Sequence, residues 1–279
     1  MVNYIKTLSL FGILTAILVL VGWFLGGQDG LITAFIFSLI INAGAYFFSD
    51  KIALSFSQAK PLSSKEAPEI YAMVADLAAK MKIPPPKIFI TPDKQANAFA
   101  TGRDSKHASI AITSGIVNLL NPLELKAVLA HELSHVNNQD ILIVTLAAVI
   151  ASAISFLARN QFHGGFSRNE NRRSGILDLF LLLLAPLAAT LIQLAISRQR
   201  EYQADYSGAR VLGTGQPLAS ALLKLDASTK QIPVVNTPPA LAQLYIASPF
   251  GGVTGSLANL FSTHPPISER VKRLQEKVL

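Results

Sequence analysis

The sequence His131-Glu132-Leu133-Ser134-His135 places two histidines four residues apart. On an α-helix this spacing puts both imidazoles on one face, where they can bind one metal ion. Glu132 lies about 100° around the helix from His131, within reach of a water on that metal. A zinc ion lowers the pKa of such a water toward about 7, and the glutamate can then take its proton. The pattern therefore predicts a metal-dependent hydrolase, and the competing interpretation is an amphipathic helix with two polar histidines.

The residues before the two histidines predict a helix from Pro122 to about Asn138. Asn121 is a favourable N-cap, Pro122 suits the first helical position, and Glu124 stands where a capping box requires an acid. The local sequence thus supports the helical conformation that the spacing of the histidines requires.

A catalytic zinc ion usually takes three protein ligands and leaves a fourth position for water. The extended HExxHxxGxxH motif would need glycine at 138 and histidine at 141, where this chain has Asn138 and Ile141. We therefore expect a remote third ligand, and the best candidate is Glu201, which shares a helical face with Asp205. Glu201 would complete a two-histidine, one-glutamate site, and Asp205 would accept a hydrogen bond from a ligand histidine. Taken alone, an acidic pair beside two arginines is also typical of a solvated ion-pair network.

Three motifs together resemble the HtpX family of bacterial membrane-bound zinc metalloproteases, whose relatives include membrane peptidases of the CAAX prenyl-protease type. They are HELSH at 131–135, SRQREYQAD at 197–205 and STHPP at 262–266. The resemblance implies one zinc ion per chain, bound by His131, His135 and Glu201, with Glu132 as the catalytic base. It also implies polypeptide substrates, namely damaged or misfolded membrane proteins, and a role in quality control and stress response at the bacterial inner membrane.

The composition predicts an integral membrane protein. Hydrophobic residues make up 51% of the chain and charged residues 15%, and the mean hydropathy is +0.41. Four uncharged runs can each cross most of a hydrocarbon core about 30 Å thick: 8–25, 31–48, 141–158 and 179–196. The first lacks a small-x-small cleavage site, so we expect an uncleaved anchor. The predicted fold class is mainly α, of the α+β type, with about four transmembrane helices and a cytosolic gluzincin-like zinc peptidase domain of helices and a small β-sheet.

These runs divide the chain into four predicted parts. Residues 1–49 form two transmembrane helices, 50–140 the first part of the catalytic domain, 141–196 a transmembrane or re-entrant helix pair, and 197–279 the second part with the third zinc ligand. One zinc site requires both polar blocks on one side of the membrane, and their lysine and arginine content predicts the cytoplasm. Four arginines between the last two runs conflict with this orientation: Arg159, Arg168, Arg172 and Arg173. Either the larger blocks dominate, or the pair is re-entrant, which Pro186 would allow.

The charge of the chain bears on its partners. The net charge of +7 and the isoelectric point near 9.6 are explained most simply by attraction to anionic lipid at the cytoplasmic leaflet. No basic stripe with interleaved aromatic residues is present, so we expect no nucleic-acid partner. The absence of cysteine excludes a disulfide framework and a thiol nucleophile. The expected partners are therefore polypeptide substrates and the lipid bilayer, and the oligomeric state is left undefined.

Between the second hydrophobic run and the HELSH segment, the sequence predicts a helix and a small sheet. The helix spans about 65–82, with Ser63 or Ser64 as its cap and a stripe of apolar residues on one face. After a triple-proline break, short strands are expected at 87–91, 96–101 and 107–112.

Two polar residues outside the ligand set are candidates for contact with substrate. By resemblance to the family, 97–101 is the edge strand that pairs with an extended substrate, and Asn97 contacts the substrate backbone. The alternative is an asparagine that satisfies its own loop. His264 either donates a hydrogen bond to the developing oxyanion or caps the helix that starts at Pro265 and Pro266.

The C-terminal part holds one irregular segment and one helix. Residues 226–261 are rich in proline, glycine and serine, and they are predicted to form either a mobile lid or a surface against the bilayer. Three apolar side chains in this segment are expected to be exposed: Tyr245, Ile246 and Phe250. The final helix is expected to pack through one apolar face: Ile267, Val271, Leu274 and Val278.

The preferred function is a membrane-anchored zinc endopeptidase. An intramembrane protease would carry its HExxH motif inside an apolar run, but Glu124, Lys126 and Asp140 surround the motif here, and each such charge costs about 3 kcal/mol at a bilayer centre. The alternative from a different class is a non-enzymatic membrane scaffold or holdase with a structural zinc. The intact Glu132 argues against it, because a structural site needs no base.

Overall fold

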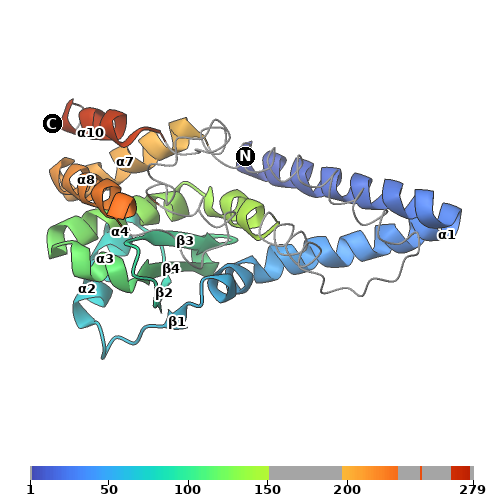
Figure 1. The fold of residues 1–279 in the computed structure, drawn as a ribbon, viewed down its shortest axis with the longest axis horizontal. Helices are drawn as coiled ribbons and strands as arrows, with labels where there is room; N and C mark the ends of the chain where they lie inside the picture. The colour runs from blue at the N-terminus through green and yellow to red at the C-terminus, as the bar shows by residue number, and fades with distance from the viewer. Residues whose placement is uncertain (1, 151–196, 232–245, 247–264, 277–279) are drawn as a thin grey trace.

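The computed structural model describes residues 2–150, 197–231, 246 and 265–276. Over these residues the protein is mainly helical with one small mixed sheet, as the sequence predicts. A long helical hairpin, α1 (Val2–Phe56), projects from a lobe that contains the sheet and the other helices, here called the sheet lobe (Figure 1). The predicted run 179–196, the arginines at 159–173 and His264 lie outside the described residues.

Helix α1 contains the two predicted N-terminal spans. It is broken at Gly26 and Gly27, where the backbone leaves helical geometry and Gly27 has φ 57°. The two arms approach so closely that a side chain at Gly22 or Gly30 would collide with the facing arm. Segments Thr7–Phe24 and Gly26–Phe56 are each long and apolar enough to cross a membrane, and only 11% of each is buried. The described residues thus confirm two of the four expected candidate spans.

The sheet has four strands in the order β1-β2-β4-β3. Strand β2 (Lys87–Thr91) is parallel to β4 (Ala108–Thr113), while β1 (Lys60–Pro61) and β3 (Ala98–Gly102) pair antiparallel on the outside. Strand β3 is therefore an edge strand, as expected, although the sequence did not reveal β1. The expected strand at 107–112 starts one residue late because the Asp104 carboxylate accepts N–H groups of a 3₁₀ turn, Ser105–His107.

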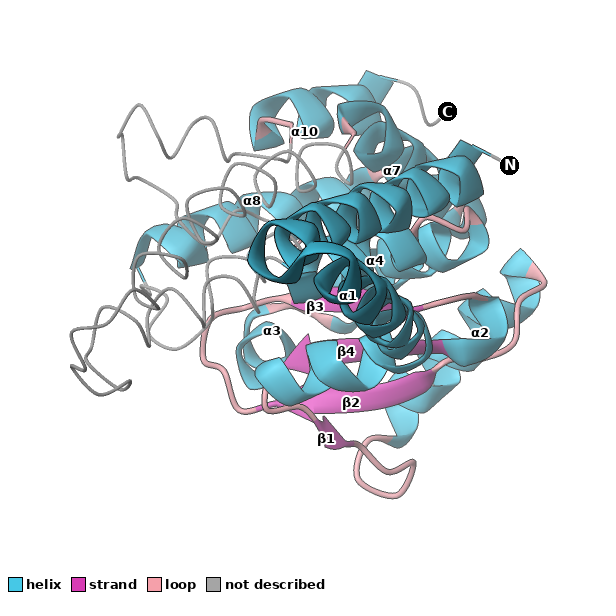
Figure 2. Cartoon of the chain, turned by 90° about the vertical axis from the view of Figure 1, so that its right-hand side faces the viewer, coloured by secondary structure: helices cyan, strands magenta, loops and turns pink. Residues whose placement is uncertain are grey.

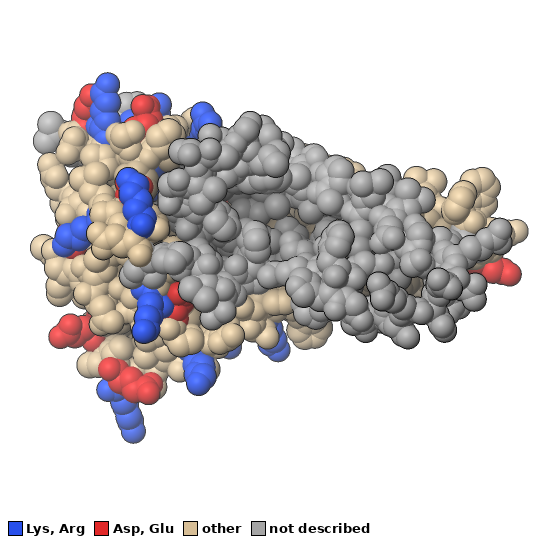
Figure 3. Space-filling model, viewed as in Figure 1, with Lys and Arg blue, Asp and Glu red and all other residues tan. Residues whose placement is uncertain are grey.

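Helices α10 (Ile267–Glu276), α7 (Arg198–Leu212) and α4 (Pro122–Asn137) form layers on the β3 side of the sheet. From one side of the molecule to the other, the layers run from α10 through α7 and α4 to β3 (Figure 2). Helix α4 packs against α7, α8 (Gln216–Gln231), α2 (Pro68–Met81) and β3, so it is the centre of the fold. Charged side chains gather on this lobe (Figure 3).

Several expected boundaries were wrong for local reasons. Helix α2 begins at Pro68 and not at residue 65, because the residue before a proline avoids helical geometry, and Ala67 has φ −140°. Ser63 and Glu66 instead close a separate turn through reciprocal hydrogen bonds. A short helix, α3 (Ser114–Leu119), was not expected; the Thr113 side chain caps it.

The segment expected to be irregular from residue 226 is helical as far as Gln231, where α8 ends. Ile246, expected to be exposed, has only 2% of its surface accessible. Its peptide N–H and carbonyl are both held by buried polar side chains, which explains the burial. The other residues of 232–261 lie outside the described part of the chain. In the final helix, Val271 and Leu274 are buried as expected.

Candidate metal centre

Helix α4 places the two histidines of the HELSH segment. The predicted capping box is present, since Asn121 accepts the Glu124 N–H and Glu124 accepts the Asn121 N–H. Eleven of the 16 residues of α4 are buried, including His131 and Glu132. Their burial requires polar partners inside the protein, because an unpaired polar group would be costly there.

Helix α7 supplies the other half of the site. It begins at Arg198 and carries Glu201 and Asp205 one turn apart on the face toward α4. Gly208 permits the close approach of the two helices, because a Cβ there would lie 3.0 Å from the backbone nitrogen of His131. The acidic pair is therefore buried against the histidines and does not form a solvated surface network.

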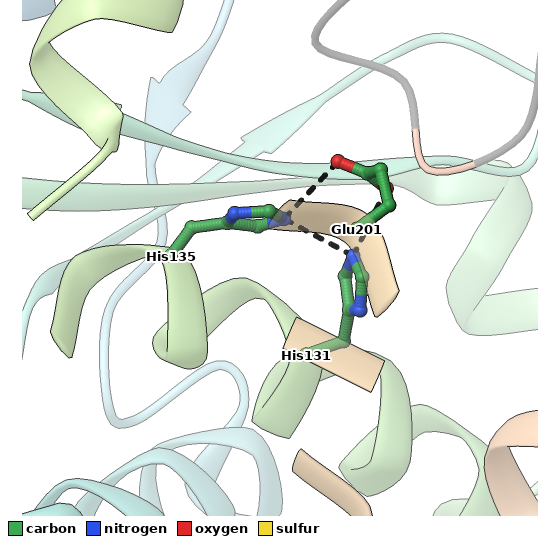
Figure 4. Close-up of side chains that lie close together, drawn as sticks. All are labelled: His131, His135 and Glu201. Atoms are coloured by element: carbon green, nitrogen blue, oxygen red, sulfur yellow. Dashed lines mark hydrogen bonds and ion pairs between the residues drawn. The ribbon is translucent and has the colours of Figure 1, made fainter. Parts of the chain in front are cut away.

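The side chains of His131, His135 and Glu201 converge from the two helices (Figure 4). The two Nε2 atoms are 3.2 Å apart, and the Glu201 oxygens lie 3.7 Å from His131 Nε2 and 3.6 Å from His135 Nε2. Ligands about 2.0–2.1 Å from a tetrahedral zinc ion lie about 3.3 Å from one another. The three residues therefore fit a metal ion of this size and geometry.

The second ring nitrogen of each histidine faces a buried carboxylate. Asp205, which the sequence predicts to contact a ligand histidine, lies with Oδ1 2.9 Å from His131 Nδ1. Asp140 lies with both oxygens 3.2 Å from His135 Nδ1. Sequence reasoning missed this contact. Its only signal was an acid five residues after the second histidine, and its position depends on how α4 ends.

Arg270 of α10 is the second residue that sequence reasoning missed. Its guanidinium is fully buried and donates to both oxygens of Asp205, at 2.8 and 2.7 Å. Burial alone would raise the pKa of Asp205, but Arg270 and His131 lower it to about 2. The sequence did contain a signal for the burial of Arg270. On a helix it shares a face with the apolar positions 267, 271 and 274.

Glu132 stands between the metal-binding residues and the edge strand. Its Oε2 accepts the Ala100 N–H of β3 at 2.9 Å, and only 4% of the residue is exposed. Burial raises the pKa of Glu132 to about 8, against the opposing effect of His135. Glu132 thus joins the helix of the two histidines to the edge strand β3.

The ionisation of His135 bears on metal binding. Burial alone would lower the pKa of His135, but the carboxylates of Asp140 and Glu201 raise it to about 10. A metal ion therefore competes with a proton for this ring, and binding is expected to weaken as the pH falls.

Asn97, the expected substrate contact, is buried at the start of β3. Its Oδ1 accepts the Ile246 N–H at 3.1 Å, and the Ile246 carbonyl accepts from Arg270 Nη1 at 2.9 Å. The Asn97 Nδ2 is buried with no hydrogen-bond partner among the described residues. The asparagine therefore links β3 to residue 246, and its contact with substrate stays a prediction.

A buried two-histidine, one-glutamate centre, an adjacent glutamate at a sheet edge and an apolar hairpin of membrane length are the features of a membrane-associated metalloprotease. Residues 64–278 match the model of Peptidase family M48, and the chain belongs to this family. A protein named Protease HtpX homolog from Pelotomaculum thermopropionicum is 47% identical, over 98% of each chain. Another of that name, from Thermococcus sibiricus, is 46% identical over 98% of this chain and 95% of that protein. The family resemblance inferred from the three motifs is confirmed.

A solved structure shares the fold. The crystal structure of S. mikatae Ste24p superposes with a TM-score of 0.52 at 23% identity, covering 98% of this chain and 65% of that one. The chain thus spans about two thirds of the length of that protein.

Proposed function

We propose that this metalloprotease is a zinc-dependent endopeptidase that cleaves polypeptides beside the membrane. One observation carries the proposal: the buried triad of His131, His135 and Glu201 has the spacing of zinc ligands, and Glu132 lies between it and the edge strand β3. Two histidines and one glutamate form a ligand set that zinc peptidases use, which leaves one position for water or substrate.

The chain's own residues account for the chemistry. His131, His135 and Glu201 would hold the zinc ion, which would supply Lewis acidity to polarise a peptide carbonyl and acidify water. Glu132 takes the proton of the attacking water and passes it to the leaving amine. Burial raises the pKa of Glu132, which favours a carboxyl that takes up a proton and later returns it. Asp205 holds His131 through its Nδ1, with Arg270 behind it.

Substrate binding is assigned to strand β3. The Ala100 N–H points away from β4 and is accepted by Glu132, so the outer edge of β3 runs beside the assigned base. An extended polypeptide that pairs with this edge would exchange that hydrogen bond for one of its own. Strand β3 packs against α1, which brings this edge next to the apolar hairpin. We assign to this site unfolded segments of membrane proteins, cleaved in quality control at the cytoplasmic face of a bacterial inner membrane, with Asn97 and His264 as candidate substrate contacts.

A membrane holdase with a structural zinc is the competing function. A structural site needs four closed ligands and no base, whereas the described part of the chain supplies three ligands with Glu132 beside them. The endopeptidase would cleave polypeptides repeatedly when zinc is bound, whereas the holdase would bind zinc without cleaving them.

The test is cleavage of an unfolded reporter protein by the full chain in lipid nanodiscs, after chelation and after zinc repletion. Wild type should regain cleavage with zinc. Glu132→Gln should bind zinc equally but lose on the order of 10²–10⁴-fold in rate. Glu69→Gln, on the exposed first turn of α2, is the matched control. Full activity of Glu132→Gln would refute the assigned base, and zinc binding without cleavage by wild type would favour the holdase.

A further inference from the structure

The second ligand histidine is held by a residue outside all three sequence motifs. In Figure 4 one ring nitrogen of His135 faces His131 and Glu201 while the other points away from them. That outer nitrogen, Nδ1, meets the Asp140 carboxylate, and Asp140 is 1% exposed. A carboxylate in this position fixes the orientation of a ligand imidazole and increases its basicity.

The way in which α4 ends puts Asp140 there. Helix α4 stops at Asn137, and Gln139 takes a left-handed conformation with φ 58°. This turn brings the Asp140 N–H to the His135 carbonyl at 3.2 Å. The next residue starts the helix Ile141–Ile150, which leaves α4 at an angle of 94°. Asp140 is therefore the hinge between the metal-binding helix and this following helix.

The following helix is seated against both the membrane hairpin and the edge strand. Leu142 and Leu146 pack with Leu10 of α1, and Ala148 packs with Phe99 of β3. The Thr145 hydroxyl lies 3.1 Å from that of Thr101, also on β3. The position of Asp140 thus depends on how this helix packs between α1 and the sheet.

The neighbourhood of Asp140 also differs from that of Asp205. Both carboxylate oxygens of Asp205 accept hydrogen bonds from the buried Arg270. Asp140 interacts electrostatically with Arg200, a residue of the same α7 that carries Glu201. Arg270 comes from the far C-terminal helix, whereas Asp140 is covalently continuous with the helix that follows it. Asp205 is therefore held by a helix of the sheet lobe, whereas Asp140 is held by the helix that packs against α1.

We propose that Asp140 is a positioning residue that orients His135 for metal binding and makes metal affinity depend on the packing of helix Ile141–Ile150 against α1. The inference rests on the metal centre of the proposed function. It adds a physical link between the membrane-embedded part and the site, since a shift of this helix would rotate or release His135.

The first test measures zinc affinity of the full chain in lipid nanodiscs by competition with a chromophoric chelator. Asp140→Asn keeps the size of the side chain but removes its charge, and zinc affinity should fall on the order of 10–100-fold. Visible absorption of the cobalt-substituted protein should change as well, because His135 is less tightly oriented. Asp76→Asn, which weakens partly exposed ion pairs with Lys80 and Lys126, is the matched control and should change neither readout.

The second test addresses the link to the helix. Leu146→Ala creates a cavity where the helix meets α1, and it should lower zinc affinity several-fold in the wild-type background but not further in Asp140→Asn. Leu225→Ala, a cavity of the same side-chain size in α8, should leave zinc affinity unchanged in both backgrounds.

The outcomes separate this inference from the proposed function. Wild-type zinc affinity and cobalt spectrum in Asp140→Asn would overturn the positioning role, and additive effects of Leu146→Ala and Asp140→Asn would overturn the link. Zinc binding that depends on Asp140, without any cleavage, would refute only the proposed peptidase. No zinc binding by wild type would overturn both.

Discussion

Helix α4 buries charged and polar side chains, whereas helix α1 exposes large apolar side chains. Helix α4 encloses Glu124, His131 and Glu132, all less than 5% exposed. Helix α1 presents large apolar groups outward, with Trp23 at 59% and Phe24 at 79% exposure. Burial of charged side chains is unusual unless they are paired, and exposure of a large apolar surface to water is unfavourable. They are explained if the surroundings of α4 are a protein interior that supplies partners and those of α1 are lipid.

The partners in α4 are specific. Glu124 accepts from Ser220 at 2.6 Å and from Lys224 at 2.7 Å, both on α8. Glu132 accepts from the β3 backbone, and His131 meets Asp205. By contrast, polar contact between the arms of α1 is made by a neutral side chain, Asn42, which donates to Thr15 at 2.9 Å and to the Phe11 carbonyl at 3.4 Å. Burial of charge therefore marks the functional helix, and exposure of apolar surface marks the anchor.

The largest effect is expected where a charge in the interior is a metal ligand. Glu201→Ala removes one of the three ligands. Loss of a residue that only positions a ligand lowers zinc affinity by at most roughly 100-fold, so this change should lower it further. Metal content after dialysis against dilute chelator is the measurement. Glu269→Ala, whose side chain is 44% exposed, is the control and should retain stoichiometric zinc. Retention of zinc by Glu201→Ala would exclude Glu201 as a ligand.

The next effect concerns Arg270. Arg270→Gln leaves the Asp205 carboxylate buried without its cation, which should reduce stability by about 3–5 kcal/mol. Arg270→Lys should recover part of this, because lysine keeps the charge but not the two parallel hydrogen bonds. Thermal unfolding in saturating zinc provides the comparison. Arg273→Gln, in a half-exposed pair with Glu269, should cost about 1 kcal/mol or less. Equal losses for Arg270→Gln and Arg273→Gln would mean that burial of the charge is unimportant.

A smaller effect tests the surroundings of α1. Ile36→Arg places a charge on the outward face of the second arm, where lipid should make it cost about 2.5–3.5 kcal/mol. The protein retained in the membrane pellet after alkaline extraction should decrease. Leu223→Arg on α8 is the control, because Leu223 and Ile36 have the same exposure, 53%. If both variants behaved alike, the outward face of α1 would not be in lipid.

The smallest effect is a pH dependence. Burial would raise the pKa of Glu124, but hydrogen bonds from Lys224, Ser220 and Asn121 outweigh it and leave the pKa below its usual value. A lowered pKa adds stability above the ordinary value of about 4.3, and this contribution is lost as the pH falls toward the folded-state pKa. Glu124→Gln should therefore unfold with a flatter acid dependence than wild type. Parallel acid unfolding curves for the two proteins would contradict this.

The sequence predicted what depends on local patterns. The caps of α4, the hairpin spans and the facing positions of Glu201 and Asp205 follow from spacing and composition, and the structure contains each of them. Arg270 and Asp140 could not be assigned in the same way. Each reaches its partner through tertiary packing or an unusual turn. The periodicity of α10 places Arg270 on a buried face, but it does not identify Asp205 as the partner, and Asp140 has no periodicity that indicates its contact. Burial of Ile246 likewise depends on partners at 97 and 270.

The central claim is that His131, His135 and Glu201 bind one zinc ion and leave a position open. Zinc-edge X-ray absorption of the full chain in nanodiscs tests this directly. The account predicts one zinc per chain in a four-coordinate environment, with two imidazole nitrogens at about 2.0–2.1 Å and oxygen at the remaining positions. A closed site without an exchangeable oxygen, or zinc bound without imidazole, would contradict it.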